Sequence, residues 1–151
     1  MSRATPKLRS QDLRFRTRKG TQWLPSSERG KTVLLAYFSS YCPPCFLEFP
    51  EIERRVWQRF KDRGDVAVVG VASPADSPTM IAHFIRQTGI TFPVVFAPQP
   101  PPRHVARPEE LITYYPFDVI LGPDGRVVDV STVVDIPHLI ATISRLTATK
   151  R

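Results

Sequence analysis

The chain has 151 residues, of which 42% are hydrophobic and 10% aromatic, a composition that fits one compact domain and argues against disorder. It holds no run of eighteen apolar residues and no signal-peptide core, so we expect no membrane-spanning segment in it. Much of its net charge of +7 lies in the first twenty residues. We interpret residues 1–12 as a flexible basic tail and residues 13–151 as the folded domain. Since no basic helix carries interleaved aromatic residues, nucleic acid is not an expected partner.

The first predicted elements lead to a buried strand. Residues 13–24 predict a short strand or a hairpin around Gly20, and residues 26–31 a polar turn. The continuous apolar run at residues 32–38 is typical of a strand that is buried on both faces, as in the centre of a parallel or mixed sheet.

A long helix is predicted next. Apolar side chains recur at three- and four-residue intervals from Phe46 to Phe60, which indicates one buried helix face that ends near Gly64. Pro50 lies inside this helix and should kink it. The remaining predicted elements are a strand at 66–72, a helix from Ser77 to Gly89, a strand at 90–96, a proline-rich loop at 97–108, a short helix opening at Pro108, a strand at 117–121, a hairpin turn at 123–125, a strand at 126–130 and a helix from Asp135 to Leu146.

This order of elements predicts the fold class. Strands alternate with helices in the first part of the chain, and a hairpin comes late. We therefore predict an α/β fold, a three-layer α/β/α sandwich with a central mixed sheet and helices on both faces.

The two cysteines of the chain form a Cys42-Pro43-Pro44-Cys45 motif. Cys42 follows a buried strand and opens a helix, where free N–H groups and the helix dipole favour a thiolate. Cys45 lies one helical turn further on and can attack a mixed disulfide at Cys42, which releases the partner as a dithiol. The spacing therefore suits reversible thiol–disulfide exchange.

Three other interpretations of the cysteines stay open. A zinc site needs four ligands, and the histidines His83, His104 and His138 have no ligand-like spacing. A structural disulfide here would close a very small loop and stabilise the fold little. A thiol peroxidase would place its reactive cysteine in a similar turn and use Cys45 as the resolving thiol, and this is the serious rival.

Four features in chain order point to a known family. They are Gly30-Lys31-Thr32-Val33-Leu34-Leu35, the C-x-P-C-x-x-E-x-P pattern of residues 42–50, Ile90-Thr91-Phe92-Pro93-Val94, and Pro116 standing eight residues before Asp124-Gly125. A lone C-x-x-C pattern is weak, but all four in order are specific. From about Leu13 to the last helix, the chain resembles the TlpA/ResA-like thiol–disulfide oxidoreductases of the thioredoxin superfamily.

The resemblance implies roles for the site residues. Cys42 would be the exposed nucleophile and Cys45 the buried resolving thiol. Pro116 would form a cis peptide bond, lie against the cysteines and present the backbone at Tyr115 to an extended substrate segment. Glu48 matches the family's active-site glutamate and would handle protons or tune the thiols; the alternative is a surface carboxylate on the helix. The expected substrate-binding residues are Tyr41, Pro43, Pro44, Tyr115 and Pro116.

The resemblance also implies partners and a compartment. It implies a bacterial protein-disulfide reductase whose client is apocytochrome c, as in cytochrome c biogenesis, or another extracytoplasmic protein, with an upstream thiol as electron donor. The redox-active disulfide Cys42–Cys45 would serve without a cofactor or metal, and we expect a monomer. We expect the periplasm or another extracytoplasmic site, with a leader or anchor missing from this sequence; the cytoplasm is the alternative. A thiol-dependent peroxidase of peroxiredoxin type and a non-catalytic interaction module on a thioredoxin fold are the alternative functions.

Departures from the family pattern sharpen these expectations. Tyr41 stands where the family usually has tryptophan, and Phe117 stands where it usually has threonine. Ala36 occupies the position of thioredoxin's buried acid, which makes Glu48 the residue expected to handle the proton. Asp118 is either an outward strand residue or a second carboxylate near the site. The loop at 98–103 is either a tolerated surface insertion or a partner-recognition segment.

The two prolines predict the direction of electron flow. Pro43 and Pro44 have no backbone N–H, so two donors that could stabilise the Cys42 thiolate are missing. We therefore expect a reductant rather than a strong oxidant.

Overall fold

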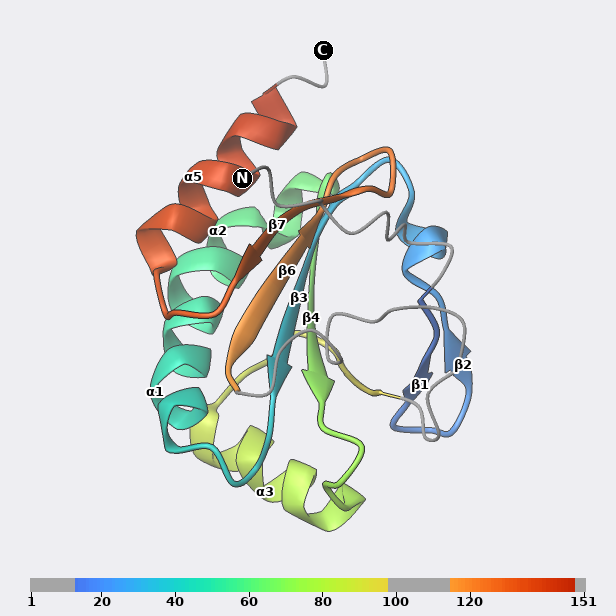
Figure 1. The fold of residues 1–151 in the computed structure, drawn as a ribbon, viewed down its shortest axis with the longest axis vertical. Helices are drawn as coiled ribbons and strands as arrows, with labels where there is room; N and C mark the ends of the chain where they lie inside the picture. The colour runs from blue at the N-terminus through green and yellow to red at the C-terminus, as the bar shows by residue number, and fades with distance from the viewer. Residues whose placement is uncertain (1–12, 98–114, 149–151) are drawn as a thin grey trace, which may run out of the picture.

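The structure is a computed structural model that describes residues 13–97 and 115–148. The strands of the described residues form one sheet in the order β2-β1-β5-β4-β3-β6-β7 (Figure 1). β4 pairs in parallel with β3 and β5, and the other neighbours are antiparallel, which confirms the predicted mixed sheet. The strands are β1 (Phe15–Thr17), β2 (Gln22–Trp23), β3 (Thr32–Phe38), β4 (Val66–Ala72), β5 (Val94–Phe96), β6 (Phe117–Leu121) and β7 (Val127–Ser131).

The helices of the described residues contribute to the core on one face of this sheet, so the second helical layer of the predicted three-layer sandwich is not seen among these residues. The longer ones are α1 (Pro43–Glu51), α3 (Pro78–Thr88) and α5 (Ile136–Ala148), and Figure 1 shows α1 and α5 along the same side of the strands. Phe49 of α1 and Phe84 of α3 are fully buried there, with their rings at 5.2 Å. The opposite face holds a second core, in which Tyr37 and Phe117 stack at 4.3 Å. The predicted loop at 98–103, His104 and the helix predicted to open at Pro108 lie outside the described residues, as does the basic tail 1–12.

The long helix after the cysteines exists, but it changes geometry along its length. α1 gives way to a π-helical segment, η3 (Ile52–Trp57), then to α2 (Gln58–Phe60) and a 3₁₀ turn, η4 (Lys61–Arg63). Pro50 cannot donate to the carbonyl four residues earlier, and the widened turns begin two residues after it. Gly64 ends the segment with a φ of 75°, as the sequence predicted.

Two predicted strand boundaries are wrong. The strand expected at 90–96 spans only Val94–Phe96, because the N–H of Thr91 donates to the Glu53 carboxylate and Pro93 has no N–H to donate. The strand expected at 126–130 is β7, Val127–Ser131, one residue later; Arg126 lies at the end of the hairpin turn, where its carbonyl accepts the N–H of Gly122 at 2.8 Å. The hairpin around Gly20 is present, and a 3₁₀ turn, η2 (Pro25–Glu28), follows it.

Candidate active site

Cys42 and Cys45 lie where β3 passes into α1, and they form a disulfide with a Cα–Cα distance of 5.3 Å. Cys42 is the N-cap of α1, and its sulfur accepts the backbone N–H of Cys45 at 3.2 Å. Cys45 is completely buried, as the resemblance implied, but Cys42 is only 7% exposed, so the expectation of an exposed nucleophile is wrong in the oxidised protein: its sulfur is bonded to Cys45 and packed at the start of α1. An incoming thiol or disulfide can therefore reach Cys42 more easily than Cys45.

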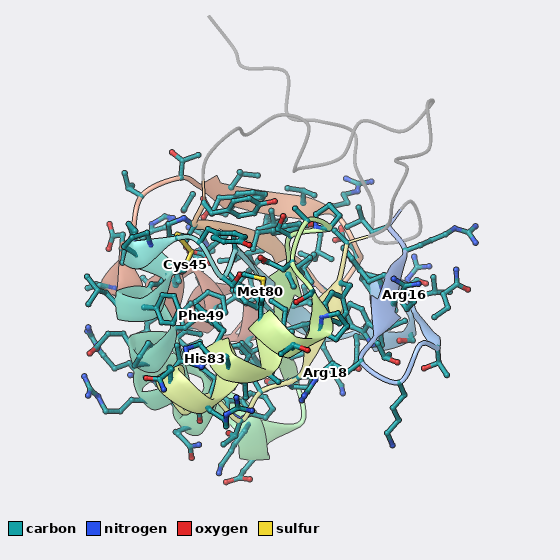
Figure 2. All side chains as sticks on the ribbon, turned by 90° about the horizontal axis from the view of Figure 1, so that it is seen from below. Arg16, Arg18, Cys45, Phe49, Met80 and His83 are labelled. Atoms are coloured by element: carbon teal, nitrogen blue, oxygen red, sulfur yellow. A yellow bond between two sulfur atoms is a disulfide. The ribbon has the colours of Figure 1, made fainter. Side chains whose placement is uncertain are left out.

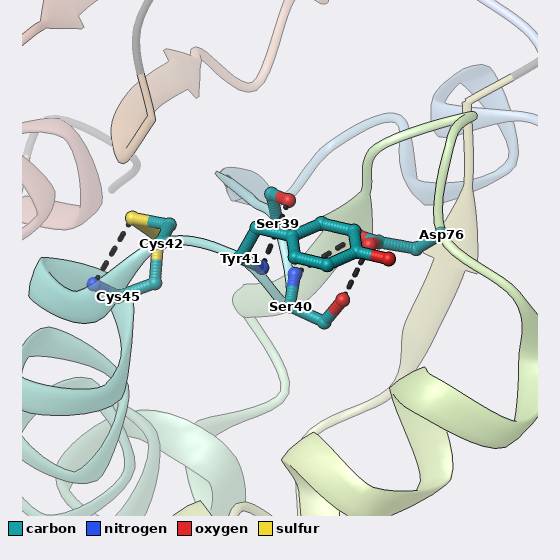
Figure 3. The surroundings of a disulfide bond; sticks show 6 residues. All are labelled: Ser39, Ser40, Tyr41, Cys42, Cys45 and Asp76. Carbon is teal, nitrogen blue, oxygen red and sulfur yellow. Dashed lines mark hydrogen bonds between the residues drawn. A yellow bond between two sulfur atoms is a disulfide. The ribbon is translucent and has the colours of Figure 1, made fainter.

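The loop that delivers Cys42 is held by Asp76, a residue that the sequence analysis missed. Asp76 follows β4 and accepts hydrogen bonds from the backbone N–H of Ser40, at 3.0 Å, and from the Ser40 hydroxyl (Figure 3). Within the loop, Ser39 Oγ accepts the N–H of Tyr41 at 3.2 Å. Because β3 and β4 are parallel neighbours, their carboxyl ends meet at one sheet edge, which brings Asp76 next to Ser40. Parallel pairing of the two predicted strands is the feature from which this contact could have been expected.

The residues expected to bind substrate lie at this end of the molecule. Tyr41 is 71% exposed, and its hydroxyl donates to Met80 Sδ at 3.3 Å. Pro43 and Pro44 are also exposed. They form, with Tyr41, an exposed surface around Cys42.

Tyr115 and Pro116 directly precede β6, which lies on the side of β3 opposite to β4. The peptide bond between them is cis. Pro116 is buried, whereas Tyr115 is half-buried and stacks on Phe117 at 5.7 Å. The β3–β6 register pairs Tyr37 with Phe117, so Pro116 lies level with the end of β3, where the chain enters the loop to Cys42.

Two carboxyl groups are buried near the cysteines. Glu48, one helical turn after Cys45, is 1% exposed, so its interpretation as a surface carboxylate is wrong. Asp118 is also 1% exposed, so its interpretation as an outward strand residue is wrong as well. Burial raises the pKa of Glu48 to about 7, although a hydrogen bond from the Asp118 side chain lowers it in part. The pKa of Asp118 lies well above its ordinary value, chiefly through burial and then through the charge of Glu48.

Metal-ligand clusters and membrane-spanning helices are both absent from the described residues. Among residues 13–97 and 115–148, no three histidine, cysteine, aspartate or glutamate side chains gather as metal ligands. No helix in the described part of the chain is long and apolar enough to cross a bilayer. Arg16 and Arg18 lie on the side of the molecule away from Cys45 (Figure 2).

This geometry, a C-x-x-C disulfide at the start of a helix beside the centre of a mixed sheet, defines a thioredoxin-like fold. The chain matches the AhpC/TSA family over residues 4–130 and belongs to it. It is 31% identical over 107 residues to the thiol-disulfide oxidoreductase ResA of Bacillus subtilis, a match that covers 71% of this chain and 56% of ResA. It is 24% identical to the thioredoxin-like protein YneN of the same organism, over 79% of this chain and 66% of YneN. The chain thus spans about half to two thirds of these relatives. The resemblance to ResA-like proteins is confirmed.

Solved structures agree on the fold. A thiol:disulfide interchange protein of the thioredoxin family from Chlorobium tepidum superposes with a TM-score of 0.69 at 22% identity, covering 97% of this chain and 98% of that one. A secreted Mycobacterium tuberculosis disulfide oxidoreductase, homologous to Escherichia coli DsbE, superposes with a TM-score of 0.66 at 17% identity, covering 91% and 98%. At these identities the likeness shows the fold alone, and it confirms the predicted α/β class.

Proposed function

We propose that this protein is a protein-disulfide reductase that works by dithiol exchange through Cys42 and Cys45. The observation that carries the proposal is the disulfide at the start of α1, in which Cys42 keeps a small exposed fraction and Cys45 is completely buried. In the reduced protein, the Cys42 thiolate attacks a client disulfide and one client sulfur leaves as a thiolate. Cys45 then attacks Cys42, the mixed disulfide breaks, and the client leaves as a dithiol. An upstream dithiol donor returns two electrons to the Cys42–Cys45 disulfide.

The surface around Cys42 fits a polypeptide substrate. Tyr41, Pro43 and Pro44 offer an exposed, largely apolar surface without backbone donors at the prolines. On the other side, the backbone of Tyr115, which lies beside the end of β3, would pair with an extended client segment. In this proposal, the exposed surface at Tyr41, Pro43 and Pro44 and the backbone of Tyr115 together form the client-binding site.

Glu48 is the proposed proton-handling residue. It lies three residues after Cys45 on the same helix, so its carboxyl group lies on the face that carries the resolving thiol. A carboxyl whose pKa is raised to about 7 exchanges protons near neutral pH, which is what the ionisation of a buried thiol requires.

The client and compartment in this proposal are those that the resemblance to TlpA/ResA-like proteins implies. The client is an extracytoplasmic protein, in cytochrome c maturation or a comparable process, and the protein acts on it as a monomer on the extracytoplasmic side. The likeness to ResA and to a solved structure described as secreted supports this choice.

The test compares two activities of the purified protein. With a dithiol donor in excess, the protein should accelerate the reduction of insulin disulfides and should consume little hydrogen peroxide. Cys42→Ser should abolish insulin reduction. Since the chain belongs to the AhpC/TSA family, a thiol-dependent peroxidase is the second candidate. Rapid Cys42-dependent peroxide turnover without insulin reduction would establish that function instead.

Cys45→Ser identifies the client. Without the resolving thiol, Cys42 should stay joined to client proteins as mixed disulfides, which mass spectrometry can name. The double variant with Cys42→Ser is the matched control and should trap nothing.

A further inference from the structure

Asp118 is a buried carboxyl group on the central strand β6. Its direct register partner on β3 is Ala36, and its partner on β7 is Ser131. Direct partners in an antiparallel pair share a face of the sheet, and Ala36 belongs to the core beneath α1 that also contains Cys45. Asp118 therefore lies next to the position of thioredoxin's buried acid, one strand across, and points toward the same helix.

Asp118 meets Glu48 in this core. The two carboxyl groups lie close enough for each to shift the pKa of the other. No donor on another described residue reaches either oxygen of Glu48 or Oδ1 of Asp118. Two buried carboxyl groups in contact cannot both be ionised at neutral pH, so the pair holds at least one proton.

The charges around the pair decide which group holds that proton. Glu48 of α1, which also carries Cys45, and Asp129 of β7 are the charged groups that act on Asp118. Asp129 in turn pairs with His138 of α5 at 3.0 Å. Burial, then the charges of Glu48 and Asp129, raise the pKa of Asp118 well above its ordinary value, which favours its protonated form. The hydrogen bond from Asp118 lowers the pKa of Glu48, as expected when Asp118 is the donor.

We propose that Asp118 is a positioning residue for the exchange reaction: its protonated carboxyl donates to Glu48 and keeps Glu48 available as the carboxylate that takes the Cys45 proton. This inference rests on the proposed function. In the resolving step, the proton of the Cys45 thiol passes to the Glu48 carboxylate, and the Cys45 thiolate attacks Cys42 Sγ. The Cys42–client bond breaks, and the client sulfur leaves with the electron pair and takes a proton from solvent. When a donor dithiol reduces the disulfide, Glu48 returns its proton to Cys45.

The test isolates the resolving step. Stopped-flow mixing of the reduced protein with 5,5′-dithiobis(2-nitrobenzoate) forms a mixed disulfide at Cys42, and attack by Cys45 releases a second chromophore. The pH profile of this release is measured for the natural protein, Asp118→Val, Asp118→Asn and the exposed-site control Asp124→Asn. In the oxidised protein, ¹³C NMR of the Glu48 carboxyl, assigned with Glu48→Gln, reports the titration directly.

Asp118→Val removes the donor but leaves Glu48 buried. The midpoint of the pH profile of chromophore release and the midpoint of the Glu48 NMR titration should therefore both rise, by about one pH unit. Such a rise lowers the carboxylate fraction at pH 7 from about one half to about one tenth, so release should be about fivefold slower there. Asp118→Asn keeps an N–H donor toward Glu48 and should stay close to the natural protein, as should Asp124→Asn.

Two results would overturn the proposal. One is an Asp118→Val profile that matches the Asp124→Asn control; the other is an Asp118→Asn shift as large as that of Asp118→Val. If Asp118→Val does not fold, Asp118→Ala replaces it under the same criteria. The readouts do not depend on client turnover: a protein that fails to reduce insulin but shows the Asp118→Val shift would reject the proposed function and leave the Asp118–Glu48 coupling standing.

Discussion

Glu48 and Glu53 lie five residues apart on the helical segment that follows Cys45, and both are largely buried. Glu48 is 1% exposed, and burial raises its pKa to about 7. Burial also acts to raise the pKa of Glu53, but hydrogen bonds from Gln58, Thr91 and Phe92 outweigh it, and the net pKa is lowered. The first carboxyl is therefore built to exchange a proton and the second to stay ionised.

Glu48→Gln should change the pH dependence of stability. Because the folded protein binds the Glu48 proton more tightly than the unfolded chain does, this contribution is complete below about pH 4.5. It is lost as pH rises through about 7, with a loss of about 3 kcal/mol in the free energy of unfolding. Urea unfolding of the oxidised protein should show that Glu48→Gln loses much of this slope and gains stability at pH 8. Glu28→Gln, remote from the site, serves as the control. Equal slopes in Glu48→Gln and the natural protein would contradict the assignment.

Glu53→Ala should destabilise the fold near neutral pH, whereas Glu48→Gln should stabilise it at pH 8. It leaves the N–H and hydroxyl of Thr91 and the amide of Gln58 without their acceptor, which should cost about 2 kcal/mol of unfolding free energy at pH 7. A lowered pKa means that the ionised form stabilises the fold, so this contribution is present above the ordinary carboxyl pKa and is lost as pH falls. The difference from the natural protein should therefore shrink in acid. If urea unfolding gives the same difference at pH 3 and pH 7, the ionised carboxylate is not its source.

At the scale of elements, the active-site loop is tied to its neighbour across the sheet edge. The loop from β3 to α1 carries Ser40 and Cys42, and the loop from β4 to α3 carries Asp76, which is 6% exposed. The two hydrogen bonds from Ser40 to Asp76 join these loops. They fix the backbone two residues before the nucleophile.

Asp76→Ala should slow client reduction more than it unfolds the protein. The loss of both acceptors should cost about 1–2 kcal/mol of stability. The loosened loop should lower kcat/KM for insulin reduction by about tenfold, because small displacements of a nucleophile are costly. Asp62→Ala, which removes an exposed aspartate from η4, should leave both quantities unchanged. Full activity in a destabilised Asp76→Ala protein would show that the tie is structural only.

The elements that the sequence predicted well are those with a strong hydrophobic pattern or with clear capping residues at their ends. The apolar run of β3 and the Ser77–Gly89 limits of α3 depend on local patterns, and the structure has both. The Ser40–Asp76 tie and the burial of Asp118 depend on which strands become neighbours, and no local pattern states this. The strand at 90–96 was predicted too long for the same reason, since the carboxylate that takes the Thr91 N–H belongs to a helix 38 residues earlier in the chain.

At the scale of the whole molecule, the question is which way electrons flow through the Cys42–Cys45 pair. The buried resolving thiol and the exposed surface at Tyr41, Pro43 and Pro44 suit exchange with a polypeptide in either direction. The direction depends on how well the protein stabilises the Cys42 thiolate, because a stabilised thiolate makes the dithiol form more favourable and the disulfide more oxidising.

The structure refines the argument from the two prolines. The side chain of an N-cap residue accepts from the second or third helical N–H. The third belongs to Cys45 and reaches Cys42 Sγ at 3.2 Å, whereas the second belongs to Pro44 and is missing. Pro43, at the first helical position, removes an N–H that is not aimed at the cap. Pro44 is therefore the residue that withholds a donor from Cys42.

The reduction potential should then lie near that of thioredoxin, about −270 mV, rather than near about −120 mV as in DsbA. Pro44→Ala supplies the missing donor and should raise the potential by about 30 mV, the equivalent of one hydrogen bond to a charged group. Pro43→Ala is the matched control and should change it little. Equilibration with dithiol–disulfide buffers, followed by alkylation of the free thiols, measures all three proteins. A natural potential near the DsbA value, or equal shifts in the two proline variants, would mean that the missing Pro44 N–H does not set the direction of electron flow.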